Sequence, residues 1–145
     1  MSCIVRFDAP DCDIDELVTE LDLDIGSIYR QGEPMTIRRR GNNKRSGLTL
    51  RASEAEFDDF KQQVADAIAF ITINLVELCK LGRIASRIPK SRFYFDFGIN
   101  TRMFDVGVQI DCFPTDLVRL IAEIGAGLVL SQYPPSDDEE EEMVT

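Results

Sequence analysis

Alternating apolar side chains between Arg92 and Ile99 constrain the fold more than any other feature of the sequence. Every second residue there is apolar, while polar or small residues stand between them: the apolar positions are Phe93, Phe95, Phe97 and Ile99. Successive side chains of a strand point to opposite faces, so this pattern predicts a strand with one face in the core. A sheet with one apolar face needs a second layer to cover it.

Three segments with helical periodicity can provide that layer. Asp13 and Glu16 fit the start of a short helix, and Pro114 and Gly125 mark the two ends of another. The longest helix is expected to begin at a capping box, Ser53-Glu-Ala-Glu56, and to stop near Leu81 because Gly82 follows. Its apolar stripe predicts the main core helix and comprises Phe57, Phe60, Val64, Ile68, Ile71, Leu75 and Leu78.

The remaining strands are expected to pair mostly as hairpins. Phe104–Asp111 repeats the alternation and is predicted to fold back on the 92–99 strand through a turn at 100–103. Two short strands, 35–40 and 47–52, are predicted around the turn residues 41–43, and further strands at 3–8 and 128–133. The order is then β-α-β-β-α-β-β-α-β. This predicts an α+β fold whose largely antiparallel sheet has helices packed on one face, with residues 1–135 as a single domain and 136–145 as a disordered acidic tail.

The charges are sorted along the chain. The net charge is −10, yet eight carboxylates precede Arg30 without an intervening base after Arg6, and six basic residues lie between 38 and 51 without an acid. Surfaces sorted by sign steer charged partners and raise association rates, although they perform no chemistry. The sequence therefore indicates binding to a charged partner.

Several function classes lack their usual residues. The chain has no His, no CxxC pair, no glycine-rich nucleotide loop and no GxSxG motif. We therefore expect no cofactor, no metal and no enzymatic activity. The sequence shows no signal peptide and no apolar run long enough to span a bilayer, and four cysteines without a pairing pattern suit free thiols in a reducing cytoplasm.

One carboxylate group keeps an enzymatic or metal-binding alternative open. Asp96 and Asp105 fall on the outward face of the predicted 92–111 hairpin, with Asp111 at its end. Two carboxylates on neighbouring strands could hold a divalent metal or share a proton. The plainer explanation is that they are polar residues on a half-solvated sheet face.

Three short segments around the long central helix suggest a resemblance to a known group. They are Arg30-Gln-Gly-Glu33, Phe95-Asp-Phe-Gly98 and Leu130-Ser-Gln-Tyr-Pro134. Together they resemble a loosely defined bacterial group of small α+β proteins of unknown function, some of which are expected to act as immunity proteins in toxin systems. The resemblance covers residues 1–134 and implies a fold and a binding role. It supplies no catalytic residues.

We therefore predict a non-enzymatic acidic binding protein, an immunity or inhibitor protein that neutralises a toxin or another basic protein partner. Three surfaces are candidates for the contact. They are the acids that cap no helix (Asp15, Glu20, Asp22 and Asp24), the basic hairpin (Arg38, Arg39 and Arg40) and the outward sheet face (Tyr94, Asp96 and Gly98, with Gly107). The alternative is a nucleic-acid-associated protein, which either binds phosphate through residues 38–45 or mimics DNA with its acids. Residues 36–51 contain no aromatic side chain for stacking on bases, so nucleic acid is the less favoured partner.

Overall fold

Five strands form one mixed sheet with the order β2-β3-β1-β4-β5. The structure is a computed structural model that describes residues 1–35 and 41–134. Its strands are β1 (Cys3–Ala9), β2 (Ser27–Tyr29), β3 (Ser46–Ser53), β4 (Arg92–Asn100) and β5 (Gly127–Tyr133), and its helices are α1 (Ile14–Thr19), α2 (Phe60–Ile73), α3 (Leu75–Arg87) and α4 (Thr115–Ile124). The predicted α+β class is confirmed.

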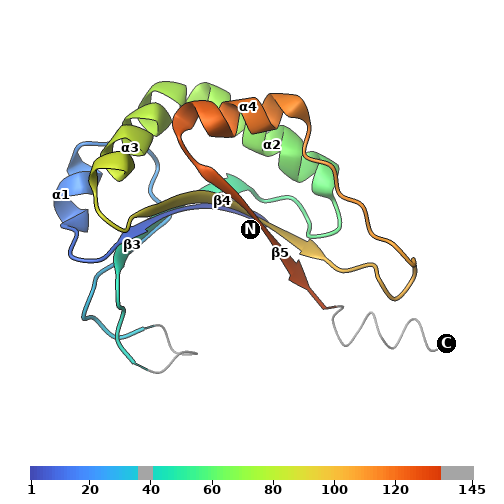
Figure 1. Ribbon diagram of the computed structural model, residues 1–145, viewed down its shortest axis with the longest axis horizontal. Helices are drawn as coiled ribbons and strands as arrows, with labels where there is room; N and C mark the ends of the chain where they lie inside the picture. Colours follow the sequence, from blue (N-terminus) through green and yellow to red (C-terminus); the bar gives the residue numbers. More distant parts are fainter. Residues whose placement is uncertain (36–40, 135–145) are drawn as a thin grey trace.

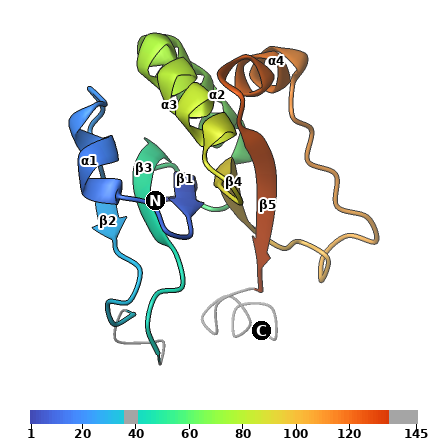
Figure 2. The same ribbon diagram turned by 60° about the vertical axis from the view of Figure 1, so that its left-hand side comes forward.

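The helices cover one face of the curved sheet. α2, α3 and α4 lie across it, and α1 lies beside its β2 end (Figures 1 and 2). The apolar positions of β1 and β4 point into this layer and are fully or nearly fully buried, as the alternation predicts: Cys3, Val5, Phe7, Phe93, Phe95 and Phe97. Three of the four strand pairs are antiparallel. The fourth, β4 with β5, is parallel, because α4 carries the chain back across the sheet between them.

The two short helices follow their sequence signals. The side chain of Asp13 accepts a hydrogen bond from the backbone of Glu16 at the start of α1. α4 ends at Gly125, whose φ of 78° lies in the left-handed region that glycine adopts without strain. Both boundaries are local, and local capping chemistry was enough to predict them.

The long central helix is two helices, and its predicted start and stop were wrong. Ser53 ends β3, and Asp59 caps α2 instead, accepting a hydrogen bond from the backbone of Gln62. Asn74 breaks the run, because its backbone leaves the helical region and its side chain bonds back to the carbonyl of Phe70. Gly82 lies inside α3, where it allows α4 to approach closely. A Cβ atom at Gly82 would stand 1.8 Å from the carbonyl oxygen of Ile124.

The predicted hairpin of 92–99 with 104–111 is also wrong. Both edges of β4 are occupied, one by β1 and the other by β5, so no third strand can pair with it. Residues 104–111 form an irregular segment that carries no strand. β3 pairs with β1 on one side and with β2 on the other, and no strand was predicted at β2. The predicted strand at 35–40 lies almost wholly outside the described residues.

Candidate functional site: the open face of the sheet

The face of the sheet that points away from the helices carries side chains in ordered rows. No described helix covers it (Figure 1). The strand register sets three neighbouring rows across the strands, namely Tyr29-Gly47-Asp8-Arg92, then Ser27-Thr49-Arg6-Tyr94-Gly127, then Arg51-Ile4-Asp96-Val129. We call this surface the open face. It brings together side chains from all five strands.

The first row contains a carboxylate, that of Asp8, whose two oxygens each accept two hydrogen bonds. Asp8 Oδ1 accepts hydrogen bonds from Arg45 Nε at 2.6 Å and Arg92 Nε at 2.8 Å. Asp8 Oδ2 accepts from Arg92 Nη2 at 2.9 Å and from the Tyr29 hydroxyl at 3.1 Å. The carboxylate side chain is only 3% exposed, so these contacts replace its water. The group ties four separate segments of chain together.

The surroundings keep Asp8 ionised. Burial alone would raise the pKa of its carboxyl group, but hydrogen bonds from Arg92, Arg45 and Tyr29 outweigh that effect and hold the pKa below its ordinary value. Burial and the neighbouring Asp8 raise the pKa of Tyr29 to about 12. Neither group exchanges a proton readily near neutral pH. The arrangement is a structural clamp that fixes two arginines, and it is poorly suited to general acid–base chemistry.

Two glycines on this face, Gly47 and Gly98, are covered by aromatic rings. The ring of Tyr29 lies across Gly47, where an added Cβ would meet the Tyr29 Cζ at 2.5 Å. Phe57 covers Gly98 in the same way, with its ring carbon 2.5 Å from an added Cβ, and Phe57 itself packs edge-on against Tyr133. Gly98 therefore serves packing and offers no bare platform to a ligand. Gly107 lies in the irregular 104–111 segment, away from the strand rows.

The middle of the open face holds an arginine side chain, that of Arg6. Arg6 stands between Thr49 and Tyr94 in the second row and is half-buried. It forms no ion pair with any carboxylate among the described residues. Asp96, the nearest acid of the third row, already accepts a hydrogen bond from Ser131 at 2.6 Å. A guanidinium beside an aromatic ring is suited to binding a carboxylate or a phosphate.

Cations outnumber acids on this face. The face carries four arginines, Arg6, Arg45, Arg51 and Arg92, and two acids, Asp8 and Asp96. Both acids already accept hydrogen bonds. Of the four, Arg45 and Arg92 neutralise Asp8, and Arg51 is paired with Glu54 at 3.4 Å. Arg6 is the one of these four arginines that forms no ion pair within the described residues. In a chain of net charge −10 this excess of cations is a local reversal of sign.

The structure separates the predicted acidic surface from the sheet face. Asp15 pairs with Arg30 through two hydrogen bonds of 2.8 and 2.7 Å, which lower the pKa of its carboxyl group. Glu20, Asp22 and Asp24 are exposed along the end of α1 and the loop after it. They lie at the β2 end of the molecule, with β3 and β1 between them and β4. Arg38, Arg39 and Arg40 lie outside the described residues.

The three carboxylates of the metal alternative are not brought together. Asp96 is in the sheet, Asp105 is in a turn, and Asp111 accepts hydrogen bonds from Arg102 and Gln109 at 3.0 and 2.9 Å. Residues 1–35 and 41–134 contain no group of three potential ligands placed to hold a metal ion. The alternative depended on the 92–111 hairpin, which does not form.

Of the first and second rows, only Tyr94 was a candidate from the sequence, and Arg6 and Asp8 were not. Arg6 and Asp8 are the polar members of an alternating strand, so their place on an uncovered face followed from the pattern. Their pairing with Arg45 and Arg92 did not, because it depends on which strands flank β1.

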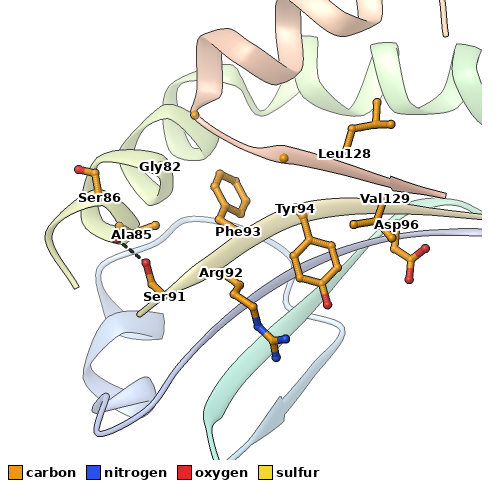
Figure 3. A pocket seen from close by; sticks show the side chains of 12 residues that line it. Gly82, Ala85, Ser86, Ser91, Arg92, Phe93, Tyr94, Asp96, Leu128 and Val129 are labelled. Carbon is orange, nitrogen blue, oxygen red and sulfur yellow. Dashed lines mark hydrogen bonds between the residues drawn. The ribbon is translucent and has the colours of Figure 1, made fainter. Parts of the chain in front are cut away.

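A hollow of about 730 Å³ lies at the start of β5, between that strand, β4 and α3 (Figure 3). Phe93, Leu128 and Val129 provide apolar walls, and Gly82, Gly125 and Gly127 leave the space for it. Arg92 lines it as well, but its guanidinium is bound to Asp8. The hollow is open to solvent at the edge of the sheet.

Comparison of the chain with protein-family models, with curated proteins and with solved structures gives no match in any of the three. Within the described residues, none of the helices has the length and apolarity needed to cross a membrane.

Proposed function

We propose that this chain is a non-enzymatic binding protein that holds an acidic segment of a partner protein on its open face, in the manner of an inhibitor or immunity protein. The observation that carries the proposal is Arg6, a guanidinium beside Tyr94 that pairs with no carboxylate in residues 1–35 and 41–134, on a sheet face that no described helix covers. Its free energy of desolvation is best offset by a carboxylate from outside the chain.

Rigidity of the surface supports a recognition role. The Asp8 clamp and the covered glycines hold the rows around Arg6 in one arrangement, so a partner meets a surface that needs little ordering. The resemblance to immunity proteins points the same way but does not identify the partner. Four free cysteines suit the cytoplasm, which is where we place the protein.

The acids at the end of α1 favour a basic partner, and they form the second candidate surface for the same function. Glu20, Asp22 and Asp24 are exposed, whereas Asp15 is partly neutralised by Arg30. Within the described residues this leaves three carboxylates without an ion pair on a short stretch of chain, where charge reversal should affect the association rate more than the stability.

Affinity capture from a lysate of the native host tests the two surfaces against each other. The baits are wild type, Arg6→Gln, the double variant Glu20→Lys/Asp24→Lys, and Arg83→Gln as a control that removes one exposed arginine from the opposite, helical side. A partner of the open face is retained by every bait except Arg6→Gln. If only the double variant loses the partner, the partner binds the acids at the end of α1. If all four baits retain the partner, neither surface is the binding site.

A nucleic-acid partner is separated by the same baits. Nuclease treatment of the lysate before capture leaves a protein partner bound, whereas a contact made through nucleic acid disappears. The captured protein is then purified and its binding to each bait is measured directly in low and high salt, because an exposed Arg–carboxylate contact weakens as salt screens it.

A further inference from the structure

Strand β5 is an edge strand without the features that usually prevent edge pairing. One edge of β5 pairs with residues 94–100 of β4. The other edge of β5 has no strand beside it in the described residues. Its seven residues, Gly-Leu-Val-Leu-Ser-Gln-Tyr, include no charge and no proline. Leu128 and Val129 are 37% and 38% exposed. Uncharged, exposed edge strands of this length are templates for pairing with another strand.

Residues 103–110, next to β5, also expose apolar side chains that no described residue covers. The side chains of their strand-like pattern face solvent, with Val108 and Ile110 exposed by 70% and 80%. Arg102 fixes the segment by bonding Gln109 through its backbone N–H and Asp111 through its guanidinium, at 2.6 and 3.0 Å. We call residues 103–110 the apolar segment. Exposed apolar patches of this kind on one molecule mark interaction sites.

The apolar segment leaves the sheet at the C-terminal end of β5. The backbone N–H of Thr101 donates to the carbonyl of Tyr133 at 2.8 Å, and the segment then swings out beside that end of the sheet (Figure 2). The hollow of about 730 Å³ lies at the opposite, N-terminal end of β5. One strand thus has an apolar projection at one end and a partly apolar hollow at the other.

We propose that the partner of this edge is a second copy of the chain, joined by antiparallel pairing of the two β5 strands about a two-fold axis at Leu130. This register sets Val129 opposite Ser131, and Gly127 opposite Tyr133 of the other copy. No charges meet across the axis, and an aromatic side chain covers a glycine across the new strand pair.

The two-fold axis also accounts for the apolar segment at one end of β5 and the hollow at the other. Antiparallel pairing brings the Tyr133 end of one copy to the Gly127 end of the other, so each apolar segment lies by the other copy's hollow. Strand pairing alone buries too little surface for a stable complex, which needs about 1,200 Å² or more in total. The apolar segments and the hollows supply the remaining contact area. The dimer would join two open faces into one continuous sheet.

Sedimentation equilibrium of the purified chain tests the proposal, with Val129→Lys as the disrupting variant and Ile73→Lys as the matched control. Lysine on a strand edge blocks pairing, whereas Ile73 is an exposed apolar residue at the end of α2. At micromolar concentrations we expect twice the chain mass of 16.4 kDa for wild type and for Ile73→Lys. We expect the single-chain mass for Val129→Lys, with the circular dichroism spectrum of the folded protein retained and a lower melting temperature, because dimerisation stabilises the folded state.

Hydrogen exchange of wild type provides a second measurement that needs no variant. In the dimer, the outward backbone N–H groups of β5 gain protection as the concentration rises, while those of α2 do not change. A single-chain mass up to several hundred micromolar, or a dimer with unprotected β5 amides, would overturn the proposal. Arg6→Gln should remain dimeric, so failure of the proposed function and failure of the dimer are told apart.

Discussion

Replacing Gly82 by alanine should loosen the helical layer from within. The new Cβ would stand 1.8 Å from the carbonyl oxygen of Ile124 and 3.0 Å from its carbonyl carbon. Both atoms belong to the backbone of α4, so no side-chain rotation can relieve the contact, and the two helices must separate. Forced overpacking of this kind costs about 3 kcal/mol, and the better helix propensity of alanine returns about 1 kcal/mol.

The net expectation is a loss of about 2 kcal/mol in the free energy of unfolding, which lowers the melting temperature by roughly 4–8 °C for a chain of this size. Urea unfolding followed by circular dichroism measures it. Gly107→Ala is the matched control, because nothing lies within 4 Å of its added Cβ, and it should change stability by less than about 0.5 kcal/mol. Equal stability of Gly82→Ala and wild type would refute the close approach of α3 and α4.

Three further substitutions have defined outcomes. Asp8→Asn should cost about 2–3 kcal/mol, below the value for a fully buried pair because Arg92 is 56% exposed, and chemical unfolding across pH measures it. Folding lowers the pKa of Asp8, so its contribution to the free energy of unfolding is present above the unfolded pKa of about 3.9 and is lost as the pH falls through the folded pKa. The free energies of unfolding of wild type and Asp8→Asn should therefore converge in acid. A difference that stays constant with pH would contradict this. Leu78→Ala, at a fully buried position, should cost about 2–5 kcal/mol in the same assay, and a loss under about 1 kcal/mol would misplace α3. Gly47→Ala should displace the ring of Tyr29 and let its pKa fall from about 12 toward 10, which ultraviolet titration of the phenol detects; an unchanged titration would exclude the ring's position over Gly47.

Sequence periodicity predicted the elements whose signals are local. The alternation in β1 and β4 and the caps of α1 and α4 depend on residues within one turn or one strand, and these were placed correctly. Residues 104–111 show the limit. Their alternation is as regular as that of β4, but pairing depends on which edges are free, and β5 arrives from later in the chain to take the edge of β4.

The candidate site shows the same division. The outward positions of Tyr94 and Asp96 followed from the strand pattern alone. The clamp did not, because Asp8 meets Arg45 and Arg92 across 37 and 84 residues of chain, and only the strand order makes them neighbours. The outward position of Gly98 was also predicted, but its cover by Phe57, from the loop before α2, is a contact that the sequence pattern does not show.

Hydroxyl-radical footprinting of the complex with the captured partner tests the central claim most directly. Tyr94 and Ile4 lie on the open face, whereas Ile73 and Val76 are exposed on the helical side by 81% and 76%. We expect oxidation of Tyr94 and Ile4 to fall on binding while that of Ile73 and Val76 stays constant. Protection confined to the helical side, with Tyr94 oxidised as fast as in the free protein, would contradict it.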